Sequence, residues 1–89
     1  MEARPYRVEF APSAVRQFRD LPREVQRRLS PRIDALALDP RPRGCVKLQG
    51  ETRYRIRSGE YRVVYEVEDR VLRVLVVRVA HRREVYREG

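Results

Sequence analysis

The stretch that decides the fold is TRYRIRSGEYRVVY, residues 52–65, in which arginine occupies alternate positions before a Ser-Gly pair. Val, Ile and Tyr favour strands, and Ser58-Gly59 favours a tight turn, so the pattern predicts a hairpin with a two-residue loop. That loop would place Arg55 directly opposite Arg62 in the neighbouring strand. The sequence therefore predicts an antiparallel hairpin in this part of the chain.

The two faces of this predicted hairpin differ in chemistry, because side chains alternate along a strand. Like charges directly opposite each other are unfavourable unless an anion lies between them, so the Arg55–Arg62 pair indicates an anion site. The alternative is the ordinary water-facing side of a sheet. The apolar face would carry Tyr54, Ile56, Tyr61, Val63 and Tyr65, and the basic face Arg53, Arg55, Arg57 and Arg62.

A strand and two helices are predicted ahead of the hairpin. The YRVEF run at residues 6–10 alternates like a strand, and Pro12 suits the first position of a helix. Leu21-Pro22 separates two helical patterns, and Pro31 should kink or restart the second, because proline removes a backbone donor. The helices would pack as a hairpin through apolar residues spaced by three or four positions: Ala14, Val15, Phe18, Val25, Leu29, Ile33 and Leu36.

The second half of the chain has the composition of strands. A proline-stiffened linker at residues 39–44 separates it from the helices. The last apolar run, VLRVLVVRV at 71–79, is apolar on nearly both faces, which is typical of an interior strand. The predicted strands are 54–57, 61–67 and 71–79, with turns at Ser58-Gly59 and Glu68-Asp69. The sequence therefore predicts one α+β domain, residues 1–89, in which a small antiparallel sheet of order β-α-α-β-β-β packs against an N-terminal helical hairpin.

The charge of the chain points to an anionic partner. A formal net charge of +8 over 89 residues, with a pI near 10.7, favours a polyanion or an acidic protein. Lys47 is the only lysine, so nearly all of this charge is guanidinium, which can hold a phosphate through two donors. The alternative is a solvated surface encoded by an arginine-rich genome.

The sequence also suggests where the protein works. No apolar run reaches the roughly 18 residues of a membrane span, and the N-terminus lacks the apolar core of a signal peptide. The single Cys45 cannot form an internal disulfide. We expect a protein of the reducing cytoplasm, with no membrane partner.

The C-terminal segment AHRREVYR, residues 80–87, adds further phosphate-compatible groups. His81 titrates near neutral pH and could move a proton, although a solvated histidine is the simpler interpretation. Tyr86 could stack on a base or anchor the C-terminal turn on the core. Arg82 and Arg83 extend the basic character of this end.

Several kinds of chemistry have no matching motif in the sequence. There is no Cys/His set for zinc, no carboxylate cluster for magnesium and no Gly-rich phosphate loop, so we expect no cofactor. A cationic face without a metal could promote cleavage of RNA by its own 2′-hydroxyl, because guanidinium groups stabilise charge on the phosphoryl oxygens. Arginine is a poor base at neutral pH, which leaves the proton transfers open.

Four segments, YRVEFAPSAVRQFRDLP, KLQG, RYRIRSGEYRVVYEV and VAHRREVYR, resemble the RelE/ParE superfamily of bacterial and archaeal toxins, and specifically its RelE branch. The hairpin pattern G-[DE]-Y-R-[VL]-[VI]-Y and the terminal pattern [KR]-R-x-x-[VS]-Y are the most specific parts, and the resemblance covers nearly the whole chain. It implies a RelE-like fold and a toxin that cuts messenger RNA in the ribosomal A site without a metal. It also implies a cognate antitoxin, and a toxin–antitoxin complex that binds operator DNA through the antitoxin.

The resemblance also implies roles for individual residues. Arg55, Arg57 and Arg62 would bind phosphate and stabilise the transition state, Arg82 would do the same after the last strand, and Tyr86 would stack on the substrate base or assist proton transfer. Either Arg82 or the neighbouring Arg83 could correspond to the arginine that follows this strand in the family. The implied catalytic residues are Arg55, Arg57, Arg62, Arg82 and Tyr86, and the RNA-binding residues are Lys47, Arg53, His81 and Arg83.

One departure from the resemblance bears on mechanism. Well-studied relatives carry lysines at the positions where this chain has Arg55 and Arg57. Lysine donates or accepts a proton more easily than arginine when its pKa is lowered. His81 is a possible substitute, although its position does not match closely. Two other functions stay open: a ParE-like toxin that poisons DNA gyrase, and a non-catalytic RNA-binding module.

Overall fold

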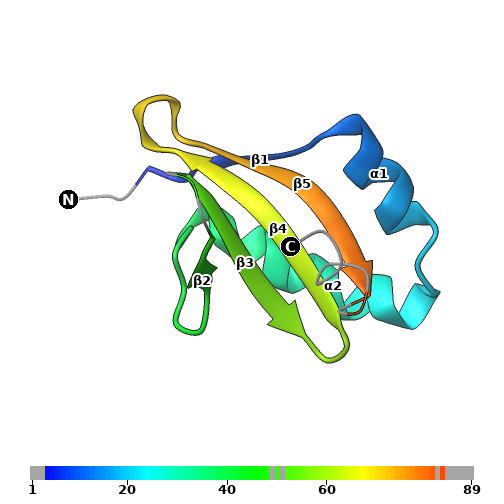
Figure 1. The fold of residues 1–89 in the computed structure, drawn as a ribbon. Helices are drawn as coiled ribbons and strands as arrows, with labels where there is room; N and C mark the ends of the chain where they lie inside the picture. The colour runs from blue at the N-terminus through cyan, green and yellow to red at the C-terminus, as the bar shows by residue number, and fades with distance from the viewer. Residues whose placement is uncertain (1–3, 49, 51, 82, 84–89) are drawn as a thin grey trace.

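A computed structural model of the chain describes residues 4–48, 50, 52–81 and 83. The α+β class and the predicted succession of strand, two helices and strands are confirmed, with one short strand added in the linker region. The elements are β1 (Arg7–Phe10), α1 (Pro12–Arg19), α2 (Arg23–Asp34), the 3₁₀ turn η1 (Ala35–Ala37), β2 (Val46–Lys47), β3 (Arg53–Ser58), β4 (Tyr61–Glu68), the 3₁₀ turn η2 (Asp69–Val71) and β5 (Arg73–His81) (Figure 1).

The two helices are joined at a proline, as the sequence predicts. Pro12 opens α1, where its missing N–H costs nothing, and Pro22 immediately precedes α2. The Gln26 side-chain amide crosses this junction and donates to the carbonyl oxygens of Phe18, Arg19 and Leu21 at 3.0–3.1 Å. Among the described residues, neither helix has the length and apolar character that crossing a bilayer requires.

The expected restart of the helix at Pro31 is wrong, because α2 runs through this residue to Asp34. The alternative expectation, a kink at Pro31, stays a prediction. Pro31 is exposed and loses one backbone hydrogen bond there. On the buried side of the same turns, Leu29 and Ile33 are 1% and 2% exposed. Burial of this apolar stripe keeps the helix continuous despite the proline.

The sheet has five strands in the order β1-β5-β4-β3-β2. β5 lies between β1 and β4, which confirms that the last apolar run is an interior strand. Strands β2 to β5 pair antiparallel, whereas β1 pairs parallel with β5, so the expectation of a purely antiparallel sheet is wrong for β1. The two helices intervene between β1 and the hairpins, so no tight turn fixes the direction of β1.

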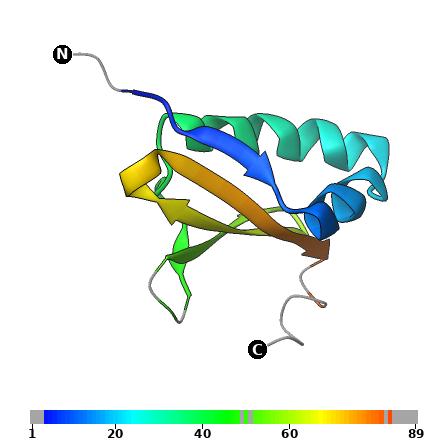
Figure 2. The same cartoon turned by 90° about the horizontal axis from the view of Figure 1, so that it is seen from above.

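One face of the sheet, here called the inner face, carries the core, and α2 crosses it (Figure 2). The predicted apolar side of the hairpin is confirmed, since Tyr54, Ile56, Val63 and Tyr65 are buried and Tyr61 packs against them. The opposite side of the sheet, here called the outer face, carries the arginines of β3 and β4. α1 lies beside β5, where Gln17 Oε1 accepts the Val79 N–H at 2.8 Å.

The hairpin register differs from the predicted one by two residues. The loop is Gly59-Glu60, so Ser58 pairs with Tyr61 and Arg57, not Arg55, lies opposite Arg62. Gly59 has a φ of 60°, a left-handed value that glycine adopts without strain. The like-charge pair therefore exists, but it is formed one step nearer the turn.

A β-bulge interrupts the pairing of β4 with β5. Val64 pairs with Arg78 and the next residue, Tyr65, pairs with Val76, so Val77 is an extra residue in β5. The bulge shifts the alternation of β5 by one position. Val74, Val76 and Val79 are consequently all buried, and Arg78 shares the outer face with Val64.

Candidate functional site

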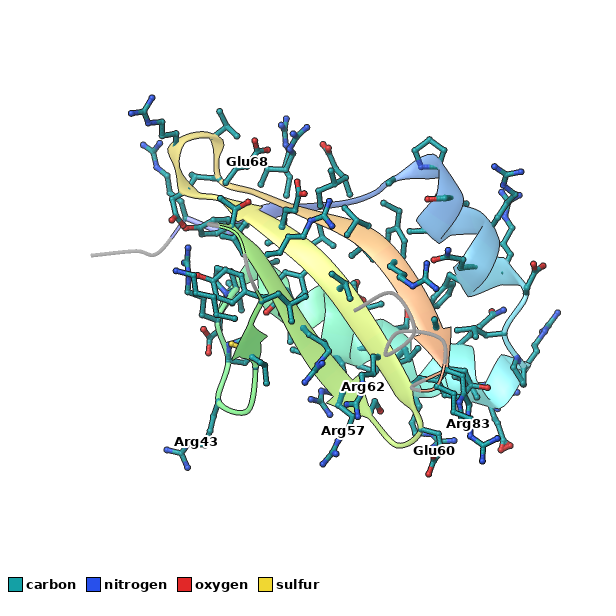
Figure 3. The ribbon with its side chains drawn as sticks, in the orientation of Figure 1. Arg43, Arg57, Glu60, Arg62, Glu68 and Arg83 are labelled. Carbon is teal, nitrogen blue, oxygen red and sulfur yellow. The ribbon has the colours of Figure 1, made fainter. Side chains whose placement is uncertain are left out.

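A pocket of about 260 Å³ opens beside the hairpin, lined by Gly44, Val46, Arg55, Arg57 and Arg62. Arg55 and Arg57 come from β3, and Arg62 comes from β4 directly opposite Arg57. Gly44 lies in the linker and Val46 is the first residue of β2. Figure 3 shows Arg57 and Arg62 near the hairpin end of their strands. The structure thus brings together three of the five residues predicted to be catalytic.

The three guanidinium side chains lie at different depths. Arg62 is only 4% exposed, Arg55 is half-buried and Arg57 is exposed. A guanidinium keeps its charge under these conditions, and fixed charge at a water-poor position acts more strongly on an anion than the same charge in bulk water. The pocket is therefore arranged to hold one anionic group, with Arg62 at its base and Arg57 at its rim.

The wall of the pocket depends on Arg41, in the linker that precedes β2. Its Nε donates to the Tyr54 hydroxyl at 3.0 Å, and its guanidinium lies 5.2 Å from the centre of the Tyr54 ring. Its two terminal nitrogens donate to the Asp69 carboxylate at 2.8 and 3.2 Å. This bidentate pair lowers the pKa of Asp69 below its usual range. Arg41 thereby connects the linker to β3 and to η2.

Two tyrosines strengthen the same attachment. The Tyr6 hydroxyl donates to Asp69 Oδ1 at 2.5 Å, which raises the pKa of that phenol. The Tyr65 hydroxyl donates to the Pro40 carbonyl oxygen at 2.7 Å, and burial raises the pKa of Tyr65. Gly44, with a φ of 91°, follows this anchored stretch and turns the chain toward β2. The pocket wall is therefore supported by core residues.

The other end of the outer face also carries arginines, but these pair with glutamates. Figure 3 shows Glu68 at the end of β4 remote from Arg62. Arg53 Nε lies 2.9 Å from Glu66 Oε2, so this predicted RNA contact is held by a carboxylate. Hydrogen bonding to Glu68 raises the pKa of Arg73. We call this region the paired end: Arg7, Glu9, Arg53, Glu66, Glu68 and Arg73.

Two predicted RNA-binding residues lie on the opposite side of the sheet from the pocket. Lys47 pairs with Tyr54, which points to the inner face, and Lys47 is exposed at the sheet edge. His81 pairs with Tyr61, with their rings 5.5 Å apart and edge to face. His81 Nε2 lies 4.0 Å from Glu60 Oε1. His81 also lines a separate pocket of about 310 Å³ beside α1. The structure does not bring Lys47 or His81 to the arginine pocket.

The remaining predicted residues follow β5. Arg82 and Tyr86 lie outside the described residues. Arg83 is exposed beyond the end of β5 (Figure 3), and its backbone N–H lies 3.4 Å from His81 Nδ1. In the part of the chain that the structure describes, no three His, Cys, Asp or Glu side chains are grouped to hold a metal ion.

Arg78 is an outer-face residue that the sequence reading did not identify. It belongs to the run VLRVLVVRV, in which strict alternation places it on the same side as Val74 and Val76. The bulge moves it to the side of Arg62 and Val64. The sequence gives no signal for the bulge, because Val77 is as apolar as the valines on either side of it. We call Arg55, Arg57, Arg62 and Arg78 the arginine end of the outer face.

Comparisons with known proteins agree with this fold. The family model described as the ParE toxin of the parDE type II toxin–antitoxin system matches residues 8–86. Among solved structures, RelE from Pyrococcus horikoshii OT3, crystallised with RelB, is 31% identical over 88% of this chain and 96% of that chain, with a TM-score of 0.79. This chain belongs to the RelE branch of the RelE/ParE toxin superfamily.

Further RelE structures show the same fold. Isolated RelE from E. coli is 32% identical and covers 93% of both chains, with a TM-score of 0.77. The RelBE2 toxin–antitoxin complex from Mycobacterium tuberculosis matches at 28% identity, covering 91% of this chain and 95% of that chain, with a TM-score of 0.78. The comparison with curated proteins finds no match. The chain is accordingly a type II toxin with the RelE fold.

Proposed function

We propose that this RelE-family toxin is a ribosome-dependent endoribonuclease that cleaves messenger RNA in the A site without a metal ion. The observation that carries the proposal is the convergence of Arg55, Arg57 and Arg62 on one pocket. An RNA phosphate is negatively charged, and a guanidinium can bind a pair of its oxygens through two N–H donors.

The proposed reaction is an internal transesterification. The 2′-hydroxyl oxygen attacks the adjacent phosphorus and loses its proton, while the bond from phosphorus to the 5′-oxygen breaks and that oxygen takes up a proton. The products are a 2′,3′-cyclic phosphate and a 5′-hydroxyl, with no co-reactant consumed. Negative charge accumulates on the phosphoryl oxygens in the transition state, and the buried Arg62 is placed to stabilise it. Arg55 and Arg57 would hold the phosphate in position.

The proton transfers fall to other groups, because a guanidinium does not readily exchange protons at neutral pH. The position of His81, on the inner side of the sheet, argues against it as the base. On the resemblance to RelE toxins, we assign base stacking or proton transfer to Tyr86 and phosphate binding to Arg82.

We further propose that a cognate antitoxin controls this toxin in the cytoplasm. The similar structures from P. horikoshii, M. tuberculosis and E. coli include complexes with RelB-type antitoxins. The net charge of +8 suits both an acidic protein partner and ribosomal RNA. In this proposal the toxin–antitoxin complex contacts operator DNA through the antitoxin.

The test is cleavage of messenger RNA on programmed ribosomes, with and without EDTA, with the cut ends mapped. We expect cuts in the A site that survive EDTA, carry 5′-hydroxyl ends and disappear with Arg62→Ala. Arg73→Ala is the matched control, because Arg73 lies on the same face but pairs with Glu68. Intact RNA with wild-type toxin bound to the ribosome would mean that the arginine pocket is only a binding surface.

The ParE description of the matching family model supports one alternative, a toxin that poisons DNA gyrase. A supercoiling assay with purified gyrase separates the two. Gyrase inhibition that is retained by Arg62→Ala, without any cleavage of messenger RNA, would favour the ParE activity. The arginine pocket would then have no part in toxicity.

A further inference from the structure

We propose that Arg43, in the linker that leads into β2, is a further RNA-binding residue and holds the phosphate next to the one in the arginine pocket. The ligand is a single RNA strand, which carries one phosphate per nucleotide. This inference rests on the proposed function, since it assigns a second contact to the same substrate.

The size of the pocket requires the RNA strand to continue outside it. A volume of about 260 Å³ is below the roughly 300–1,000 Å³ of sites that enclose a small-molecule ligand. The pocket therefore suits one phosphate, while the neighbouring phosphates lie beyond its walls. One wall is low, because Gly44 has no side chain and a Cβ added there would meet no atom within 4 Å. The strand can leave the pocket over Gly44, next to Arg43.

The turn that carries Arg43 has a fixed backbone. The Cys45 N–H donates to the Pro42 carbonyl oxygen at 3.0 Å, and Gly44 has a φ of 91°, as the third residue of a type II turn requires. Before the turn, a tyrosine hydroxyl of β4 holds the linker at 2.7 Å. After it, Val46 enters the sheet as the first residue of β2. The Cα of Arg43 is therefore held beside the pocket, and only its side chain has to be ordered by a ligand.

The two arginines of the linker differ in what they bind within the chain. Arg41 donates to the Tyr54 hydroxyl and to the Asp69 carboxylate, so its guanidinium is occupied by the fold. Arg43 is exposed, and its side chain forms no hydrogen bond or ion pair with any residue that the structure describes. Figure 3 shows Arg43 extending into solvent at the end of the molecule where Arg57 also lies. A guanidinium in this state can bind a phosphate without first leaving a carboxylate.

The first test separates substrate binding from the chemical step. With programmed ribosomes, we expect Arg43→Ala to raise KM by about three- to tenfold, the effect of losing one charged contact, with kcat within about twofold of wild type. Arg43→Lys should recover most of the KM, because lysine retains the charge. The matched control is Arg70→Ala, which removes an arginine that is likewise exposed and without an ion pair among the described residues, but lies in η2. Its KM should equal that of wild type.

A binding measurement distinguishes failure of this contact from failure of the proposed function. The probe is a single-stranded RNA oligomer that is 2′-O-methylated at each sugar, so it cannot be cleaved by the 2′-hydroxyl route. The slope of log affinity against log salt should become shallower by about 0.7 for Arg43→Ala and stay unchanged for Arg70→Ala.

The outcomes of the two assays are separable. A wild-type slope and KM in Arg43→Ala would overturn the contact, as would a fall in kcat alone. Equal changes in Arg43→Ala and Arg70→Ala would also overturn it, because they would reflect net charge and not position. If wild-type toxin cleaves nothing yet only Arg43→Ala changes the slope, the nuclease proposal fails and the RNA contact stands.

Discussion

The two ends of the outer face use the same side chain for different purposes. At the paired end, Arg53 and Arg73 lie opposite Glu66 and Glu68 of β4 and form ion pairs with them. At the arginine end, β4 offers Arg62 and Val64 at the corresponding positions. The difference lies in four positions of β4, which present carboxylates to the arginines at one end of the face and an arginine and a valine at the other.

This comparison explains why net charge alone is a poor guide to the site. The chain carries a formal charge of +8, but some of its arginines form exposed ion pairs with carboxylates. Such pairs contribute little to stability, about 0–1 kcal/mol each. On the outer face, the arginines outside the paired end, Arg55, Arg57, Arg62 and Arg78, lie toward the hairpin turn. An anionic ligand would approach the arginine end in preference to the paired end.

The largest effect, on the rate of RNA cleavage, is expected from introducing a carboxylate at the arginine end. Arg57→Glu places a negative group opposite Arg62 on an exposed position, so the fold should persist. The carboxylate would pair with Arg62 and repel phosphate, and cleavage should fall at least about 100-fold. Initial rates on programmed ribosomes, beside Arg57→Gln, measure the effect of charge reversal against simple loss of charge. Equal activity of Arg57→Glu and wild type would remove the distinction between the two ends.

A second effect concerns the turn that holds Arg57 opposite Arg62. Gly59 has a φ of 60°, and an added Cβ would lie 3.2 Å from the Arg28 Nη1 atom. Gly59→Ala should lower the free energy of unfolding by about 1–2 kcal/mol, because other L-residues are strained in this region. Glu60→Ala, at the neighbouring loop position, is the control. Urea unfolding of both variants would show whether glycine is required at the first loop position only.

A smaller effect should follow from converting the paired end toward the arginine end. Glu66→Gln removes the carboxylate that holds Arg53 at 2.9 Å. The released arginine should gain a phosphate contact, and the salt dependence of RNA binding should steepen by about 0.7 in the slope of log affinity against log salt. Salt titrations with a single-stranded RNA oligomer, 2′-O-methylated at each sugar so that it cannot be cleaved by the 2′-hydroxyl route, give the slope directly. An unchanged slope would mean that position on the sheet, rather than pairing, keeps Arg53 from RNA.

The smallest effect is a change in acid stability at the linker. The pKa of Asp69 is lowered by Arg41, so its ion pair stabilises the fold above the ordinary carboxyl pKa of about 4 and is lost as the pH falls through the lowered value. Wild-type Tm should therefore decline more steeply between pH 5 and pH 2 than the Tm of Asp69→Asn, which lacks this titration. Because Asp69 is exposed, the difference should be modest. Parallel curves for the two proteins would assign the acid loss to other carboxylates.

The faces of the hairpin could be predicted from the sequence, but its register could not. Ser58-Gly59 and Gly59-Glu60 are both acceptable two-residue loops, and changing from one to the other moves each pairing by two positions. A shift of two leaves every side chain on its original face. The apolar side was therefore correct, while the partner of Arg62 was Arg57 and not Arg55.

Other features depended on tertiary packing that local patterns do not encode. Burial of Leu29 and Ile33 carries α2 through Pro31, against its local preference. A bulge one residue long turns Arg78 outward and places His81 beside Tyr61, away from the arginine pocket. Arg41 is remote in sequence from both Tyr54 and Asp69, so its role in supporting the pocket wall becomes visible only in the folded chain.

The position of β5 has a consequence for the synthesis of the toxin. This strand lies between β1 and β4, yet it is the last of the five to be made. Until residues 73–81 have been translated, β1 lacks its neighbour and the core lacks three of its buried valines, Val74, Val76 and Val79. Chains fold as synthesis proceeds, but here the pairing of β5 with β1 and β4 has to wait until residues 73–81 have been made. The complete sheet consequently cannot form before β5 has been synthesised, so the folded toxin appears only after this strand is available.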